Sequence, residues 1–329
     1  MPQSNLMKNW KVKSPLFVIH IPKTGGLSLR MILAGILGFD NVYKLGFTRN
    51  KVNSIEDFVP MAQREESFPA YLGHFSFGAQ NHIKPKPFVI TCLRDPVTRV
   101  LSYYEYVCRY DKTRYNITDF LKKIECRNGI TRRLRGYGEY QNEAYDFSSQ
   151  KPLETSDNII TSADLSIAIE HLNTGIDFIM MQEHMSESLV MLRHRLGSPP
   201  LISLSNQFRN HSATPIHKDN YSADIINQIE ASNELDIQLY EAGKQLFQKN
   251  IDDLGVDVIN EINAMKPLCE ILSPFGQQDL NTEIIVSRFE DGINSLVRQR
   301  EYNVAVRVSL LFSEHLKNNH TLWDHTKML

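Results

Sequence analysis

Two segments in the first third of the chain share one pattern, a nearly continuous apolar run followed by a turn and then an amphipathic stretch. The apolar runs are residues 16–21 and 87–93. Runs of this length that are rich in Val, Ile and Phe are typical of strands buried on both faces of a parallel sheet. The stretches that follow, residues 27–37 and 97–109, carry apolar residues at helical spacing. Each segment therefore predicts a strand, a tight turn and a helix.

The middle of the chain continues this alternation less regularly. Residues 177–181 are predicted to form another strand, and residues 186–196 a helix that ends at Gly197. Residues 71–78 form a short apolar stretch that glycine and histidine interrupt, and residues 203–219 form a polar loop rich in Asn, Ser and His. Strands that alternate with helices indicate an α/β fold with a parallel sheet.

The last part of the chain is helical in pattern. Residues 223–250 form a long amphipathic region with a break near Ser232. Residues 282–298 and 302–316 have the same periodicity, and we expect them to form an appendage to the main domain.

The change in pattern predicts a main domain of residues 1–264 and a helical C-terminal extension of residues 265–329. One helix–turn–helix unit resembles a single tetratricopeptide repeat, but the chain contains no second copy.

Composition and charge narrow the class of protein. Hydrophobic residues make up 42% of the chain and charged residues 22%, as in ordinary globular proteins. Lys and Arg number 36 against 38 Asp and Glu, so no general basic excess would attract nucleic acid. Any anion site must then be a local cluster, and we expect no nucleic-acid partner. The four cysteines are widely spaced, which predicts reduced thiols.

The sequence also predicts where the protein resides. Residues 1–15 are polar, and the apolar run at 16–21 is too short for a signal peptide. No stretch approaches the roughly 20 apolar residues that a membrane-spanning helix needs. We therefore expect a cytoplasmic protein that does not span a membrane.

The first chemical motif is Pro-Lys-Thr-Gly-Gly-Leu-Ser at residues 22–28. It lies where the first strand turns into a helix, so backbone N–H groups and the positive end of the helix dipole can face an anion. Lys23 adds a charge, and Thr24 and Ser28 add hydroxyl donors, which together predict a phosphate-binding loop. The alternative is a tight turn with a solvent-facing lysine. The lysine precedes the glycines, so this is not a Walker A loop, and a magnesium-dependent kinase or ATPase is disfavoured.

The second motif is the segment from Arg94 to Ser102. Arg94 leaves the end of a strand, and Ser102 lies two turns into the next helix, for which Asp95 is a suitable N-cap and Pro96 a suitable first residue. The arginine fork can bind a phosphate in bidentate fashion, and the serine hydroxyl can complete the site. The alternative is that Arg94 pairs with Asp95 and that Ser102 only packs.

The two motifs together resemble the donor-binding segments of sulfotransferases that use 3′-phosphoadenosine-5′-phosphosulfate (PAPS). Residues 20–26, 73–75 and 93–96 are similar to the carbohydrate-directed branch of that family, which includes heparan sulfate 2-O-sulfotransferase. The resemblance covers roughly residues 15–250. It implies a sheet of P-loop kinase type flanked by helices, with ligands at the carboxyl ends of the strands.

The resemblance also implies roles for individual residues. Arg94 and Ser102 would bind the 3′-phosphate of PAPS. Leu27 departs from the pattern, because a threonine or serine is common there and one hydroxyl contact would be lost. The loop residues that would hold the 5′-phosphosulfate, with Leu27 among them, are Lys23, Thr24, Gly25, Gly26, Leu27 and Ser28.

For the catalytic step we predict that His74 removes the proton of the acceptor hydroxyl and that Lys23 stabilises the departing phosphate. In the resembling 2-O-sulfotransferases a histidine of the matching Gly-His segment has this role, and a second one lies two positions earlier, where this chain has Leu72. The alternative for His74 is a buried histidine that bonds a carbonyl. We expect His20 to be structural. No metal-binding pattern occurs, and the chemistry needs no metal.

Two further basic features are candidates for ligand contacts. Arg132, Arg133 and Arg135 form the densest basic cluster, which can line the cleft or form a solvated helix face. Arg209, in the polar loop, can close over the nucleotide. The acceptor is expected to be a glycan or a small hydroxylated molecule. The alternatives are sulfation of a non-sugar metabolite, or a non-catalytic nucleotide-binding or interaction module on the same fold.

Overall fold

The computed structural model of the chain describes residues 7, 9–48, 51–53, 58–59, 68–136, 159–201, 217–272, 282–298 and 305–312. Its centre is a six-stranded sheet in the order β3-β2-β4-β1-β5-β6. The strands are β1 (Leu16–Ile19), β2 (Val42–Thr48), β3 (Lys51–Asn53), β4 (Ala70–Gly73), β5 (Phe88–Leu93) and β6 (Phe178–Met181). All neighbours pair in parallel except β3, which is antiparallel to β2 at the edge. The predicted α/β class with a parallel sheet is thereby confirmed.

The strand β1 lies between β4 and β5, and every residue of the three strands is buried. Burial on both faces explains why the apolar runs at 16–21 and 87–93 do not alternate with polar residues. The strand β4 comes from the apolar stretch at 71–78, and its register places Leu72 beside Val18.

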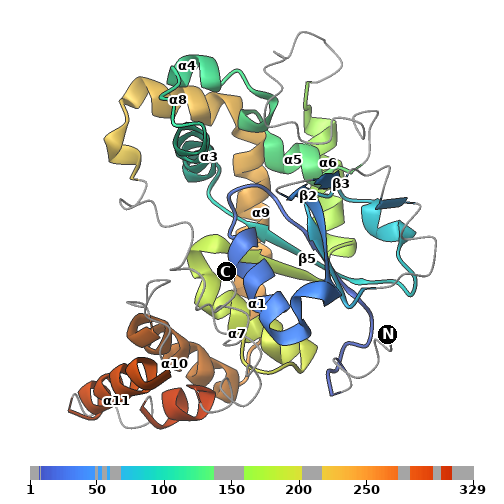
Figure 1. Ribbon diagram of the computed structural model, residues 1–329. Helices are drawn as coiled ribbons and strands as arrows, with labels where there is room; N and C mark the ends of the chain where they lie inside the picture. The colour runs from blue at the N-terminus through green and yellow to red at the C-terminus, as the bar shows by residue number, and fades with distance from the viewer. Residues whose placement is uncertain are drawn as a thin grey trace.

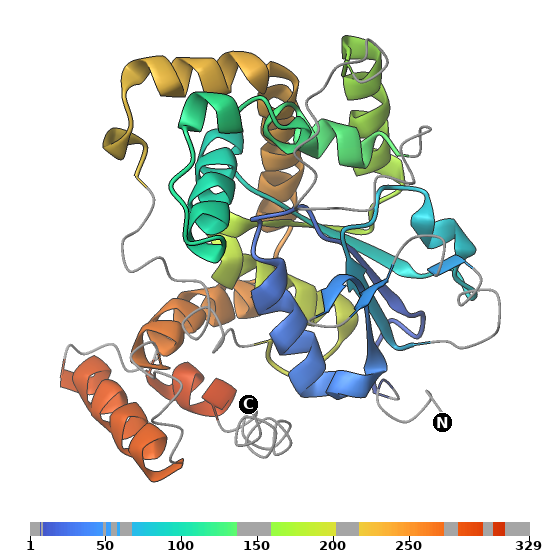
Figure 2. The same ribbon diagram turned by 45° about the horizontal axis from the view of Figure 1, so that its top comes forward.

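Helices cover both faces of the sheet (Figure 1, Figure 2). Gly26 of α1 packs against His20, which follows β1, and α7 lies on that same face. Gly243 of α9 packs against Leu93 of β5 on the opposite face, where α5 and α6 also lie. The helices of the main fold are α1 (Gly26–Leu37), α3 (Pro96–Tyr110), α4 (Ile117–Phe120), α5 (Gly129–Leu134), α6 (Ser162–Thr174), α7 (Met185–Leu196), α8 (Ala223–Ser232) and α9 (Glu234–Asp252).

Several expected elements are confirmed. The long amphipathic region breaks where α8 ends at Ser232, and α9 begins at Glu234. Asp95 is the N-cap of α3 and Pro96 its first residue. Three cysteines, Cys92, Cys108 and Cys126, are buried and form no disulfide with one another in the described residues, and their redox state stays a prediction. Most of the predicted polar loop at 203–219 lies outside the described residues.

A second apolar core joins the C-terminal helices to α7. Its members include Val190 of α7, Met265 and Leu268 of α10 (Val256–Leu272), and Phe289 of α11 (Thr282–Arg298). The ring of Phe289 stacks on Phe312, which lies in a last helical stretch at 305–312.

The same junction contains a fully buried carboxylate, Glu261 of α10. Its Oε2 accepts hydrogen bonds from Arg193 at 2.8 Å, from His194 at 2.9 Å and from Arg307 at 2.9 Å. In both ribbon views α10 lies beside α7 and α11 lies against α10, away from the sheet. Helix α10 runs across the predicted boundary between residues 264 and 265, and the division into two domains stays a prediction.

None of the helices described here has the length and apolar composition that would let it cross a bilayer.

Candidate functional site

The residues that follow β1, β4, β5 and β6 lie along one edge of the sheet, because these strands are parallel (Figure 1). They include His20, His74, Arg94 and Gln182. This carboxyl edge is where open α/β sheets bind ligands. The backbone N–H of His20 donates to the carbonyl of Gly73 at 2.8 Å, so the pairing of β1 and β4 continues to the first residue beyond the strands.

The glycine loop at 22–28 has the geometry of an anion site. Gly25 is the N-cap of α1, with φ of 88°, and Lys23 is also left-handed, with φ of 71°. A glycine at the N-cap has no side chain to accept hydrogen bonds from the first-turn N–H groups. This end of a 12-residue helix therefore presents N–H groups and its positive dipole without a capping side chain.

Both positions of the loop favour glycine, Gly25 because of its left-handed φ of 88° and Gly26 because of a close neighbour. A Cβ on Gly25 would lie 2.7 Å from the Cε of Met185, and a Cβ on Gly26 would overlap the imidazole of His20. His20 therefore rests directly on the first turn of α1, with its ring at the loop. The sequence indicated a structural role for this residue, and the structure places it between the loop and His74.

Thr24 differs from the expectation. Its side chain is fully buried, and its hydroxyl donates to the carbonyl of Ile21 at 2.8 Å. The hydroxyl stabilises the turn itself, because a threonine at this tight reversal can reach back three residues to the carbonyl. Leu27 and Ser28 are both partly buried in the first turn of α1.

Arg94 connects the two motifs directly. Its Nη1 donates to the carbonyl of Lys23 at 2.9 Å. The Nζ of Lys23 lies 4.2 Å from the centroid of the Tyr106 ring on α3, one helical turn beyond Ser102. Burial, with the charges of Arg94 and Arg109, lowers the pKa of Lys23 to about 8. The lysine is thus held in a concentrated positive field that an anionic ligand would neutralise.

The N-terminus of α3 is already capped. The Asp95 carboxylate accepts from the N–H of Thr98 at 2.8 Å and lies 3.3 Å from the Nζ of Lys218. The Asp95 N–H donates to Glu183 at 2.9 Å. The carboxylate of Asp95 thus faces Thr98 and Lys218, while Arg94 bonds the glycine loop. At this motif the groups suited to a phosphate are the Arg94 side chain and the hydroxyl of Ser102, which is 8% exposed.

His74 lies against His20 with 4.8 Å between ring centroids. Burial lowers the pKa of His74 well below its usual value, and His20, Arg133 and Lys44 add to this effect. Burial also lowers the pKa of His20 to about 3, with smaller contributions from Arg133, Lys23 and Arg30. Both imidazoles are therefore neutral at pH 7, and a neutral imidazole is the form that accepts a proton.

The arginine cluster is not a solvated face. Arg133 is 6% exposed, and its Nη1 donates to the carbonyl of His74 at 2.7 Å. Arg135 pairs with Asp164 of α6. Arg132 is partly buried beside them. Arg209 lies outside the described residues.

Two residues near the loop were not predicted from the sequence. Tyr106 was identifiable in principle, because it lies four residues after Ser102 and thus on the same face of its helix. Glu183 follows β6 and also accepts from Tyr240 of α9 at 3.1 Å, a contact that no local pattern reveals. Within the described ranges no group of three or more His, Cys, Asp or Glu side chains could hold a metal ion.

Comparison with protein families matches residues 40–274 to the family described as galactose-3-O-sulfotransferase. This span is well over half of the chain and contains His74, Arg94 and Ser102. The glycine loop precedes it, so the interpretation of that loop depends on the geometry above. Comparison with curated proteins found no match.

Proposed function

Because the chain belongs to the galactose-3-O-sulfotransferase family, a family of PAPS-dependent carbohydrate sulfotransferases, we propose that it transfers a sulfuryl group from PAPS to a hydroxyl group of a carbohydrate. The observation that carries this proposal is the bond from Arg94 to the carbonyl of Lys23. It brings two anion-binding segments together at the ends of neighbouring strands β1 and β5. His74 lies at the end of β4, on the other side of β1.

The donor contacts follow from this arrangement. Lys23 and the N–H groups of Gly26 and Leu27 would bind the 5′-phosphosulfate, and Arg94 with Ser102 would bind the 3′-phosphate. When bound, PAPS supplies the sulfuryl group, and its bisphosphate is the leaving group. Arg209 as a cation that closes over the nucleotide stays a prediction.

Two residues of the chain, His74 and Lys23, would then carry separate parts of the transfer reaction. His74 accepts the proton of the acceptor hydroxyl as the new O–S bond forms. Lys23 stabilises the charge on the phosphate oxygen whose bond to sulfur breaks. The neutral state of His74 suits this role. Burial is the main cause of the lowered pKa of His74, so a polyanion at the loop would raise this pKa only by offsetting the smaller contributions of nearby charges such as Arg133 and Lys44.

The acceptor is a carbohydrate in this proposal, and the family's description makes the 3-hydroxyl of a galactose residue the first acceptor to screen. A small non-sugar acceptor is the second class to include. We further propose a cytoplasmic location, which rests on the sequence alone.

The first experiment is calorimetric titration with adenosine 3′,5′-bisphosphate, the product nucleotide. We expect specific binding that Lys23→Ala and Arg94→Ala each weaken about 10-fold or more, as for a lost charged contact. Lys249→Ala, which removes an exposed lysine of α9, is the matched control and should bind as wild type does.

Transfer of radiolabelled sulfate from PAPS to galactose-terminated saccharides is the second measurement. Turnover that His74→Ala lowers by about 100-fold or more, with nucleotide binding kept, would support the proposal. Nucleotide binding without turnover on any acceptor would favour the non-catalytic alternative, and absence of nucleotide binding would refute the donor assignment.

A further inference from the structure

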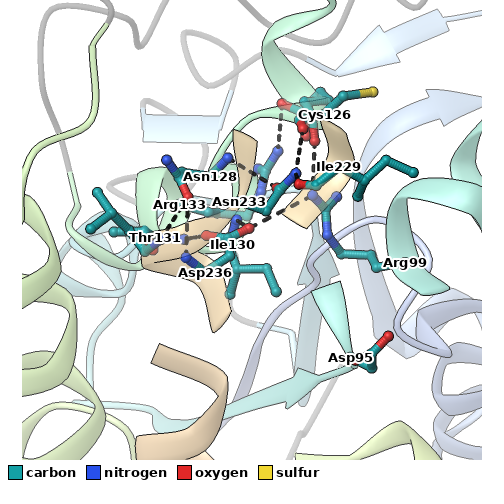
Figure 3. A network of polar contacts seen from close by, with 12 residues as sticks. Asp95, Arg99, Cys126, Asn128, Ile130, Thr131, Arg133, Ile229, Asn233 and Asp236 are labelled. Atoms are coloured by element: carbon teal, nitrogen blue, oxygen red, sulfur yellow. Dashed lines mark hydrogen bonds and ion pairs between the residues drawn. The ribbon is translucent and has the colours of Figure 1, made fainter. Parts of the chain in front are cut away.

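Helix α5 is short, and its start is held by a side chain from a distant part of the chain. The carboxylate of Asp236 in α9 accepts from the N–H of Ile130 at 2.9 Å and from the N–H of Thr131 at 2.7 Å (Figure 3). Six residues are too few for a stable isolated helix. The position of α5 therefore depends on these contacts.

The approach to α5 is fixed by the same part of α9. The Oδ1 of Asn128 accepts from the N–H groups of Leu235 and Asp236, both at 3.1 Å. In the opposite direction, the Oδ1 of Asn233 accepts from the N–H of Asn128 at 3.1 Å, and the side-chain amide of Asn233 donates to the carbonyl of Cys126 at 2.7 Å. Two reciprocal asparagines thus connect the segment before α5 to the first turn of α9 (Figure 3).

A buried charge completes the network. Arg99 of α3 lies 3.7 Å from Asp236, and both side chains have zero exposure. The Nη2 of Arg99 also donates to the carbonyl of Glu125 at 2.9 Å. Isolated buried ion pairs stabilise proteins weakly, and replacing one with apolar residues is often neutral or favourable. A gain in stability is therefore a weak explanation for this buried pair. A role in orienting α5 explains it better.

The far end of α5 reaches the candidate base. Arg133 donates to the carbonyl of His74 at 2.7 Å, and the carbonyl of Arg133 accepts from the N–H of Phe77 at 3.0 Å. The guanidinium lies 3.6 Å from Glu125, the residue whose carbonyl Arg99 binds. Two hydrogen bonds thus attach the segment that follows β4 to α5. The bonds of Asp236 to Ile130 and Thr131 attach α5 in turn to the buried pair.

We propose that Arg133 is a positioning residue for sulfuryl transfer, and that Asp236 with Arg99 orients α5 so that Arg133 holds the backbone of His74. This inference rests on the proposed function, since it takes His74 as the base. A fixed carbonyl at His74 restricts the backbone that carries the imidazole. Misplacing a reacting group by about 1 Å can cost about 100-fold in rate.

The test begins with Arg133→Met, which keeps the length of the stem and removes the donors. We expect kcat to fall at least about 10-fold, while the Kd for adenosine 3′,5′-bisphosphate stays within about 2-fold of wild type. Arg133→Lys keeps a donor for the carbonyl and should recover part of kcat. Arg127→Met is the matched control, since this exposed arginine just before α5 donates to the carbonyl of Leu121 instead, and its kcat should stay within about 2-fold of wild type.

A double-mutant cycle separates positioning from an independent role. His74→Ala removes the imidazole but keeps the carbonyl that Arg133 binds. If Arg133 acts through His74, the double variant His74→Ala/Arg133→Met is no slower than His74→Ala alone. Multiplied losses would overturn the proposal, as would an unchanged kcat in Arg133→Met or a loss of nucleotide binding in that variant. A His74→Ala variant whose kcat stays within about 2-fold of wild type would instead refute the assignment of the base.

Discussion

Gly26 offers a sharp test of how the glycine loop is built. Substitution by alanine would place a Cβ 2.0–2.4 Å from three atoms of the His20 imidazole, Cδ2, Nε2 and Cε1. The ring cannot simply retreat, because the His74 ring lies 4.8 Å away and Arg133 holds the His74 backbone. Overpacking of this kind costs about 1–3 kcal/mol. Gly26 is the first residue of α1, where the preference of helix interiors for alanine over glycine does not apply, so we expect a loss of about 1–3 kcal/mol in the free energy of unfolding.

Urea unfolding measures this loss, and a second site supplies its control. Gly255, the N-cap of α10, has no heavy atom within 4 Å of an added Cβ, so Gly255→Ala loses only the N-cap preference of glycine and should cost less than Gly26→Ala. Calorimetry should also show weaker nucleotide binding by Gly26→Ala, by about 10-fold, because the loop must shift away from the ring.

A double-mutant cycle with His20→Ala tests whether the His20 ring is the group that the added Cβ contacts. In that background the ring is gone, so Gly26→Ala should cost at least about 1 kcal/mol less than it does in wild type. An equal cost in both backgrounds would refute the contact, as would a Gly26→Ala variant that is as stable as Gly255→Ala.

Two further predictions concern charges. Asp236→Ala leaves the guanidinium of Arg99 buried without its carboxylate and leaves two N–H groups of α5 without their acceptor. We therefore expect the free energy of unfolding, measured by urea titration, to fall by about 3–5 kcal/mol. A loss below about 1 kcal/mol would contradict the role of this pair. Lys23 has its pKa lowered to about 8, so it loses its charge as the pH rises through that value, and calorimetry should show nucleotide affinity falling by up to about 10-fold per pH unit above 8. Lys23→Met should remove that pH dependence, and a slope equal to wild type would show that another group is responsible.

The parts of the fold that the sequence predicted are those fixed by neighbours in the chain. The strand β1 and the helix α1 follow from an unbroken apolar run and a glycine turn, and β5 and α3 follow from a similar run and Asp95-Pro96. Helix α5 was not predicted, because its start is held by Asp236, more than 100 residues later in the chain. Short elements that depend on such contacts carry no local periodicity.

In the candidate site, too, local features could be predicted from the sequence and long-range contacts could not. The two candidate anion motifs could be named from the sequence, because each combines a strand end with charged residues or glycines in a fixed order, and their binding of an anion stays a prediction. The buried hydroxyl of Thr24 and the place of Tyr106 under Lys23 were not, since they depend on how the turn closes and on which face of α3 meets it. The contact of Arg133 with His74 joins segments 59 residues apart, and only the tertiary structure could show it.

The buried carboxylate at the C-terminal junction has a consequence for how the chain can be divided. Glu261 precedes the predicted domain boundary, while its partner Arg307 follows it, so a cut at residue 264 would separate a buried charge from one of its counter-ions. The cut would also expose Val190 on α7, the helix whose Met185 lies against Gly25. One face of α7 thus borders the anion loop and another is covered by the last helices. Removing those helices would leave Glu261 with fewer counter-ions and would uncover this face of α7.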